Sequence, residues 1–420
     1  MMSEVSFSGL LVVTMVGFLA PLLLGLAPAL RLPAVVLEIV AGIVIGPSVL
    51  GLVAVDLPLQ VLALVGLAFL LFLAGLEIEF DRLRGRPLQL AGLSFLLSFG
   101  MALLVAYGMR AAGLVETPLL VAIIISATGL GVIIGVLKDA GQIETDFGQL
   151  VIIGATIADF ATVILLSLFF SREATSIGAQ LVLIVSLALL AVVAVVAILR
   201  AERSSRLAAV LQRLQDTTAQ IRVRGAFVLL IAFVALAEWF GLEVILGAFI
   251  AGVILSRVDR DRLMTHPQFR SKLDAIGFGV FIPIFFVASG VRFNLGALFA
   301  SAATVAQVPL FLLVLLVVRG FPALLYRPLL GRQHTLAAGL LQATSLSFIV
   351  AAAQIGMELG MLSEASGAAL IAAGLLSVLI FPLGALMVLG RDREPKTEPT
   401  PNSDETNREP RGERRESRSA

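Results

Sequence analysis

Long apolar runs separated by short polar stretches alternate along nearly the whole chain. Many runs are about 20 residues long, the length of helix that crosses a roughly 30 Å hydrocarbon core. The apolar residues are continuous rather than alternating, which argues against a transmembrane β-barrel. The pattern therefore predicts an all-α polytopic membrane protein with about thirteen transmembrane helices. The expected spans are residues 9–30, 33–53, 58–77, 87–111, 117–138, 147–171, 177–199, 224–241, 243–256, 273–291, 297–326, 333–356 and 364–390.

Composition agrees with this fold class and excludes several kinds of chemistry. The 420 residues are 59% hydrophobic and 14% charged, whereas soluble domains are about 45–50% apolar and about 25% charged. Without cysteine there is no disulfide, thiolate metal site or cysteine nucleophile, and two histidines exclude a histidine-rich metal site. No phosphate-binding loop or Ser/His/Asp arrangement is present. We therefore expect no enzymatic activity, no cofactor and no nucleic-acid partner.

Basic residues are sorted between alternate loops. One set of loops holds 18 Lys and Arg residues, and the other set holds only Arg110, Arg172 and Arg292. The positive-inside rule places the basic set in the cytoplasm. The sequence thus predicts a multi-pass protein of the cell (inner) membrane, with its N-terminus outside and its C-terminus cytoplasmic.

Three pairs of segments recur in the same order at nearly one offset. Residues 41–45 match 251–255, residues 72–76 resemble 287–291, and residues 125–134 match 341–350. The matched spans are seven apart, so the two copies cross the membrane in opposite directions. Such inverted-topology repeats are typical of secondary transporters.

This symmetry predicts the domain organisation. Residues 1–390 form the transmembrane domain, with repeat one at about 9–171, a linker helix at about 177–199 and repeat two at about 224–390. The polar residues 391–420 are expected to form a disordered cytoplasmic tail.

The fifth and twelfth spans carry small and polar residues at mid-depth, where regular helix is weakened. We expect two crossed, discontinuous helices there, whose unwound backbone could face an ion. The alternative is that the small residues serve close helix packing. The candidates are Ser126, Thr128, Gly129, Thr344 and Ser345.

Asp159 lies near the middle of the sixth span. A carboxylate at the bilayer centre costs from about 2.5 kcal/mol upward and usually faces a partner or a water-filled cavity. Such a carboxylate can hold a proton or a hard cation, but not both at once, and this competition alone couples two fluxes. Asp159 is therefore the candidate site for a proton and a monovalent cation. Arg319, in the eleventh span, is its candidate charge partner, unless its side chain instead extends to the interface.

Other carboxylates lie closer to the span ends. Glu38 is a candidate for an inner funnel or a packing role. Glu77 and Glu79 end the third span beside Arg82 and Arg84, which predicts ion pairs at the membrane interface.

Four segments closely resemble signatures of the monovalent cation:proton antiporter-2 family, which contains sodium/proton and Kef-type potassium/proton antiporters. They are residues 32–51 (LPAVVLEIVAGIVIGPSVLG), 71–78 (LFLAGLEI), 246–255 (LGAFIAGVIL) and 283–290 (PIFFVASG). The resemblance covers the membrane domain, about residues 5–390. It implies a sodium/proton-antiporter-like fold of thirteen helices, a homodimer, and an elevator movement of a core domain. The family's essential Asp falls on Asp159, its basic residue on Arg319 and a Thr of the first unwound helix on Thr128.

Two features depart from the family pattern. Ala158 stands where members usually carry Asp, Asn or Gln. One carboxylate with a permanently charged Arg partner favours one-for-one, electroneutral exchange and leaves Na⁺ and K⁺ both open. A polar tail also follows the last span where many Kef-type members carry a nucleotide-binding domain, so we expect that control to be absent.

The sequence therefore predicts a Na⁺ or K⁺/proton antiporter. Ala158 motivates an alternative, a channel-like or sensor protein on the same scaffold. An organic-anion symporter is a third reading, disfavoured because Arg319 has no second mid-membrane cation beside it.

Overall fold

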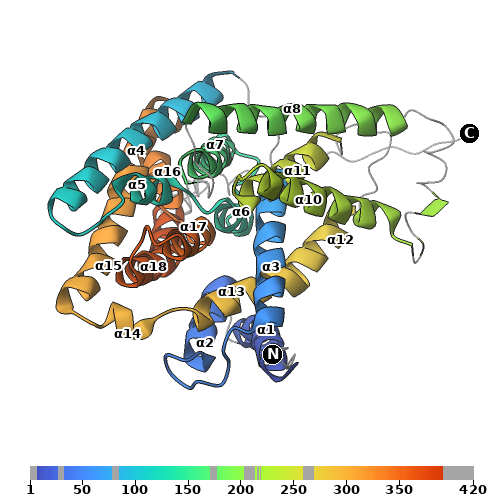
Figure 1. The fold of residues 1–420 in the computed structure, drawn as a ribbon. Coiled ribbons are helices and arrows are strands. Elements are labelled where there is room, and N and C mark those ends of the chain that lie inside the picture. The colour runs from blue at the N-terminus through green and yellow to red at the C-terminus, as the bar shows by residue number, and fades with distance from the viewer. Residues whose placement is uncertain are drawn as a thin grey trace, which may run out of the picture.

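The structure is a computed structural model, which describes residues 7–26, 33–77, 85–170, 177–202, 213–214, 217, 219–258 and 269–390. Every regular element within these residues is a helix (Figure 1). The expected tail at 391–420 lies outside them, as do Glu79, Arg82 and Arg84. The helices are α1 (Phe7–Leu26), α2 (Ala34–Ile45), α3 (Leu57–Leu76), α4 (Gly85–Ala111), α5 (Pro118–Ser126), α6 (Leu130–Asp139), α7 (Asp146–Phe169), α8 (Ile177–Glu202), α10 (Ile221–Trp239), α11 (Val244–Val258), α12 (Phe269–Ile276), α13 (Ile282–Val291), α14 (Leu295–Leu298), α15 (Ala302–Leu315), α16 (Arg327–Gln342), α17 (Ser347–Glu358) and α18 (Glu364–Gly390).

Nine helical stretches of the described residues are long and apolar enough to cross a membrane. The all-helical membrane fold is thus confirmed, but the count of thirteen spans is not. Residues 302–358 are counted as one stretch of 57 residues, and α2 and α11 are shorter apolar helices. Broken and short helices thus account for the difference from thirteen.

The helices pack as two groups, which lie on different sides of Figure 1. In the first group, α1 packs on α2, α2 and α3 pack on α13, and α11 packs on α3 and α10. In the second group, α4 packs on α5 and α7, while α16 packs on α7 and α18. Helix α8 contacts α11 and α7, one helix from each group. Each expected repeat therefore contributes helices to both groups.

Glycines bring the helices of the first group together. A Cβ at Gly75 would collide with the carbonyl oxygen of Phe249, and one at Gly252 with that of Phe72. Gly42 and Gly290 stand in the same reciprocal relation to backbone carbonyls of α13 and α2. Membrane helices associate largely by close packing at such small residues, so these contacts hold the first group together.

The start of α7 is fixed by a polar cap. The side chain of Thr145 accepts a hydrogen bond from the amide of Gly148 at 3.1 Å, which satisfies one of the free N–H groups at the helix end. Asp159 lies 14 residues further on, in a helix of 24 residues. At about 1.5 Å per residue this places Asp159 about 20 Å from the helix start, near mid-depth.

Both expected discontinuous helices are present. Residues 127–129 separate α5 from α6, and residues 343–346 separate α16 from α17. The two breaks cross, because the amide of Gly129 donates a hydrogen bond to the carbonyl oxygen of Thr344 at 2.8 Å. Two segments far apart in the sequence are thereby joined through their backbones.

The glycine contacts of the first group give a stability prediction. Gly252→Ala should lower the free energy of unfolding by about 1–3 kcal/mol, because the new methyl group pushes against the backbone of Phe72. Gly100→Ala is the matched control, since nothing lies within 4 Å of a Cβ there. Heating purified protein in detergent and measuring the monodisperse fraction compares the two. Equal melting temperatures for both variants would contradict the packing argument.

Candidate functional site

The crossing of the two breaks is held by specific hydrogen bonds. Besides the bond from Gly129 to Thr344, the hydroxyl of Ser377 on α18 accepts from the amide of Ser345 at 3.2 Å. The same hydroxyl lies 2.9 Å from the carbonyl oxygen of Ser345. In a membrane interior, unwound backbone persists only where protein or water satisfies it. The two helix breaks are therefore stabilised by specific hydrogen bonds within the fold.

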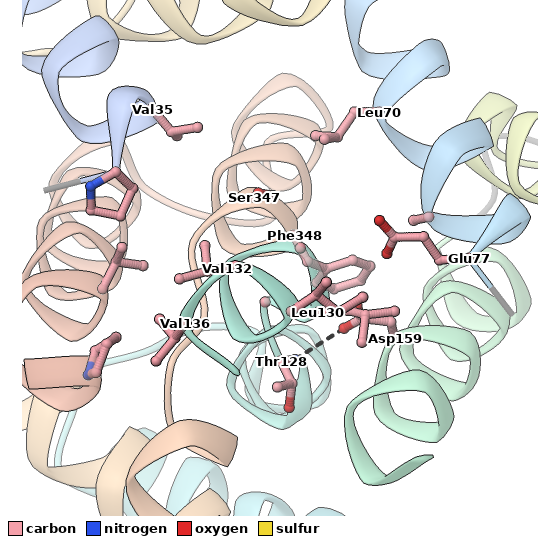
Figure 2. A pocket seen from close by; sticks show the side chains of 18 of the residues that line it. Val35, Leu70, Glu77, Thr128, Leu130, Val132, Val136, Asp159, Ser347 and Phe348 are labelled. Atoms are coloured by element: carbon pink, nitrogen blue, oxygen red, sulfur yellow. Dashed lines mark hydrogen bonds between the residues drawn. The ribbon is translucent and has the colours of Figure 1, made fainter. Parts of the chain in front are cut away.

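Asp159 faces the start of α6 at this crossing. Its Oδ1 accepts a hydrogen bond from the amide of Thr128 at 3.2 Å, drawn as the dashed line in Figure 2. The backbone of Leu130, the first residue of α6, is also directed at the carboxylate. The N-terminal end of a helix favours negative charge, because its free N–H groups and its dipole both point there. Asp159 is thus held by unwound backbone rather than by another side chain.

Asp159 also lines a cavity of about 1040 Å³. Leu70, Glu77 and Phe249 contribute to its walls from the first helix group, and Thr128 and Asp159 from the second. The cavity therefore lies between the two groups, and it includes Gln142 and Leu389 at the end of the bundle where α6 and α18 finish. In Figure 2, Val132 and Val136 of α6 line the cavity beside this path.

At the other end of the bundle, polar contacts join the two groups beside a second, smaller cavity of about 330 Å³. Arg292, after α13, forms an ion pair with Glu358 of α17 at 3.5 Å. Asn294 donates to the carboxylate of Glu364 on α18 at 2.6 Å. Asp159 lines the first cavity and is not among the residues that line this second one.

Arg319 lies on the packed side of the crossing and is 3% exposed. It belongs to a π-helical turn, Leu316–Gly320, of the kind often found at functional sites. Its guanidinium donates to Ser98 at 3.2 Å, to the side-chain oxygen of Gln342 at 2.7 Å and to the hydroxyl of Thr128. Arg319 makes no direct ion pair with Asp159 in this structure. Its charge acts on Asp159 from behind the break.

The other expected site residues divide between the crossing and the packing around it. Thr128 donates its hydroxyl to the carbonyl oxygen of Gln342 at 3.2 Å, so only its backbone reaches Asp159. Ser126 donates to the carbonyl oxygen of Ala122 within α5 at 2.7 Å and is fully buried. Thr344 donates to the carbonyl oxygen of Leu340 at 3.2 Å.

Ser345 and Glu38 are the two remaining candidates from the sequence. Ser345 is buried in the second break, and its hydroxyl has no hydrogen-bond partner among the described residues. Glu38 is buried in α2 and is not among the residues that line the cavity, although Pro33 and Val35 are.

Glu77 is the site residue that the sequence did not point to. Its expected partners Arg82 and Arg84 lie outside the described residues, so the ion pairs stay a prediction. Glu77 lines the same cavity as Asp159, and Figure 2 shows its carboxylate turned toward that side. Its basic neighbours favoured an interfacial role. The signal was helical spacing, because Leu70, Leu73 and Ala74 share its helix face and also line the cavity. A second carboxylate therefore faces the path that leads to Asp159.

Ala158 is fully buried, while its neighbour Asp159 reaches the cavity. Its carbonyl oxygen accepts a hydrogen bond from Thr162 at 2.8 Å. The methyl group supplies no ligand, so Asp159 is the side chain of this pair available to an ion.

The sequence of this chain is similar to those of a known protein family. A profile of the transmembrane domain of sodium/hydrogen exchangers matches residues 14–389. The chain belongs to the sodium/hydrogen exchanger family. Members of this family are membrane transporters and not enzymes, and the chain is accordingly a multi-pass membrane protein that needs no cofactor.

Individual relatives agree with this assignment. YjbQ of Bacillus subtilis, named for Na⁺/H⁺ antiport, is 34% identical over 95% of this chain and 66% of its own length. The chain thus spans just under two thirds of that relative. A Methanocaldococcus jannaschii protein, named for the same activity, is 30% identical over 84% of this chain and 89% of its own length.

A solved structure shows the same fold. The sodium proton antiporter MjNhaP1 of Methanocaldococcus jannaschii superposes with a TM-score of 0.62 at 17% sequence identity. The match covers 90% of this chain and 96% of MjNhaP1. The antiporter-like fold expected from the sequence is confirmed.

The absence of cysteine allows a direct test of the cavity. Val136→Cys should react with a charged, membrane-impermeant thiol reagent, because Val136 lines the cavity. Ser126→Cys should stay unmodified, because Ser126 is fully buried. Mass spectrometry of the labelled proteins gives the modified fractions. Equal labelling of the two variants would show that the cavity does not admit water as described.

Proposed function

We propose that this chain is a secondary active antiporter that exchanges a monovalent cation, Na⁺ or K⁺, for H⁺ at Asp159. One observation carries the proposal. A single carboxylate stands at mid-depth where two broken helices cross, and it faces a cavity that leads to one end of the bundle. Carboxylate and carbonyl oxygens are the ligands that hard cations prefer, and a carboxylate that binds a proton releases its cation. Competition at one site then couples the two ions.

Alternating access follows from where the cavity lies. The second helix group carries Asp159 and both breaks, and the first group supplies the opposite wall. Sliding the second group along the first, as an elevator, would close the present path and open one at the far end. That movement would first separate Arg292 from Glu358 and Asn294 from Glu364, which join the groups at the opposite end.

The basic loops give the proposed orientation. The cavity ends near Gln142 and Leu389, beside loops rich in Lys and Arg, so it would open to the cytoplasm in this conformation. A rise in cytoplasmic pH would then deprotonate Asp159 and admit the cation. The family resemblance extends the proposal to a homodimer in the cell (inner) membrane, joined through the first helix group.

Glu77 has a supporting role in this proposal. Its carboxylate faces the cavity beside the path to Asp159 and would attract a cation that approaches along it. It does not replace Asp159, because it ends α3 and receives no hydrogen bond from the crossing in the described structure.

Substitution of the central carboxylate tests the proposal. Asp159→Asn keeps the shape of the side chain but removes the group that binds the proton and the cation, so exchange should fall to the level of empty proteoliposomes. Proton flux driven by Li⁺, Na⁺, K⁺ or Rb⁺ gradients is the measurement, and it also reports selectivity.

Glu77→Gln is the matched control for this experiment. It removes a carboxylate from the same cavity and should raise the cation concentration for half-maximal exchange while leaving exchange measurable. Full exchange activity of Asp159→Asn would reject the proposal. A complete loss in Glu77→Gln with normal exchange in Asp159→Asn would move the site to Glu77.

One-for-one exchange gives a second prediction. A single exchanged proton for each monovalent cation moves no net charge, so turnover should generate no membrane current. Proteoliposomes on a capacitive membrane, given a step in cation concentration, would show this. A transient current in proportion to turnover, absent from Asp159→Asn, would reject electroneutral exchange.

A further inference from the structure

Arg319 is a buried cation without a carboxylate partner among the described residues. Its hydrogen-bond partners are Ser98, Thr128 and Gln342, and all three are neutral. A buried charge normally requires a charged partner or full hydrogen bonding, because its removal from water is costly. The neutral groups that hold Arg319 in place are therefore distinct from the groups that would bind the transported ions.

Gln342 connects the three elements that meet at the crossing. Its side-chain oxygen accepts from Arg319 at 2.7 Å, and its side-chain nitrogen donates to the carbonyl oxygen of Val151 on α7 at 2.9 Å. Its own carbonyl oxygen accepts from Thr128 in the first break at 3.2 Å. Gln342 is also the last residue of α16 before the second break. The side chain of Gln342 thus orients Arg319 and ties the end of α16 to α7, while its backbone carbonyl contacts the first break.

Gly154 makes room for this amide. A Cβ at position 154 would lie 2.5 Å from the side-chain nitrogen of Gln342 and 2.8 Å from the hydroxyl of Tyr326. Gly154 lies five residues before Asp159 on α7. The amide of Gln342 therefore fits in the space left by the absence of a side chain at Gly154.

We propose that Gln342, seated over Gly154, is a positioning residue that fixes Arg319 with an uncharged partner, so that none of the groups hydrogen-bonded to Arg319 is an acid that titrates during exchange. The inference rests on the proposed antiport and concerns how many acidic groups take up or release a proton in each exchange cycle. An amide offers an acceptor to Arg319 and a donor to Val151 at every pH. A carboxylate in the same place would lose that donor when ionised and would neutralise the charge that Arg319 directs at Asp159.

The charge arrangement is tested with Gln342→Glu, which is nearly isosteric. The added negative charge weakens the field of Arg319 at Asp159, so we expect the pH of half-maximal exchange to move to higher values by about one unit. Gln333→Glu is the matched control. Gln333 lies on the same helix and also donates its amide to a backbone carbonyl, that of Val388, but it lies outside the site. Its pH profile should match that of the wild type.

The anchoring contact is tested without reference to transport. Gln342→Ala and Gly154→Ala each disrupt the same contact, so their losses of thermal stability should not add in the double variant. Both single variants should exchange roughly tenfold to a hundredfold more slowly, because a hydrogen bond to a buried charge is lost or displaced.

The outcomes separate the two proposals. If the wild type exchanges protons and Gln342→Glu keeps its pH profile, the inference is rejected and the antiport stands. Additive stability losses in the double variant would also overturn it. A wild type without cation-dependent proton flux would reject the antiport and, with it, any effect of Gln342 on the proton count.

Discussion

The structure depends on how the membrane treats unpaired backbone. Two helices are interrupted at mid-depth, where free N–H and C=O groups would be very unfavourable in lipid. The amide of Gly129 and the carbonyl oxygen of Thr344 satisfy each other, and Ser377 supports the second break from α18. This mutual support requires the two broken helices to cross, and the crossing then determines which groups are free to bind an ion.

The crossing separates two charges by function. Asp159 stands on the cavity side, held by the amide of Thr128 and open to exchange. Arg319 stands on the packed side, held by uncharged groups and closed to water. Thr128 connects them, with its backbone toward the first and its hydroxyl toward the second. In the proposed exchange, the group that changes its charge is thereby kept apart from the one that keeps it.

Much of this could be predicted from the sequence because bilayer thickness limits the possible patterns. Span length indicated the fold class, and small polar residues in the fifth and twelfth spans indicated the breaks. Asp159 was evident as a costly carboxylate. The partners of Arg319 were not, because Gln342 and Gly154 look like ordinary residues of membrane helices until the fold brings them together. For Glu77 the sequence predicted ion pairs with Arg82 and Arg84, which lie outside the described residues, and it did not indicate that Glu77 lines the cavity. Sequence pattern reports depth well and facing direction poorly when a residue ends a helix.

The π-helical turn at Leu316–Gly320 has a consequence for how this site could arise or be lost. Such a turn carries one residue more than an α-helical turn, and one residue rotates the helix on its N-terminal side by about 100° relative to the helix on its C-terminal side. Val317, two positions from Arg319, is 43% exposed on the outer surface. Removing one residue from this turn would therefore rotate the helix on one side of it by about 100° relative to the other side. Deletion of one codon there would preserve the reading frame of the gene, but it would change which side chains of the helix face the protein interior.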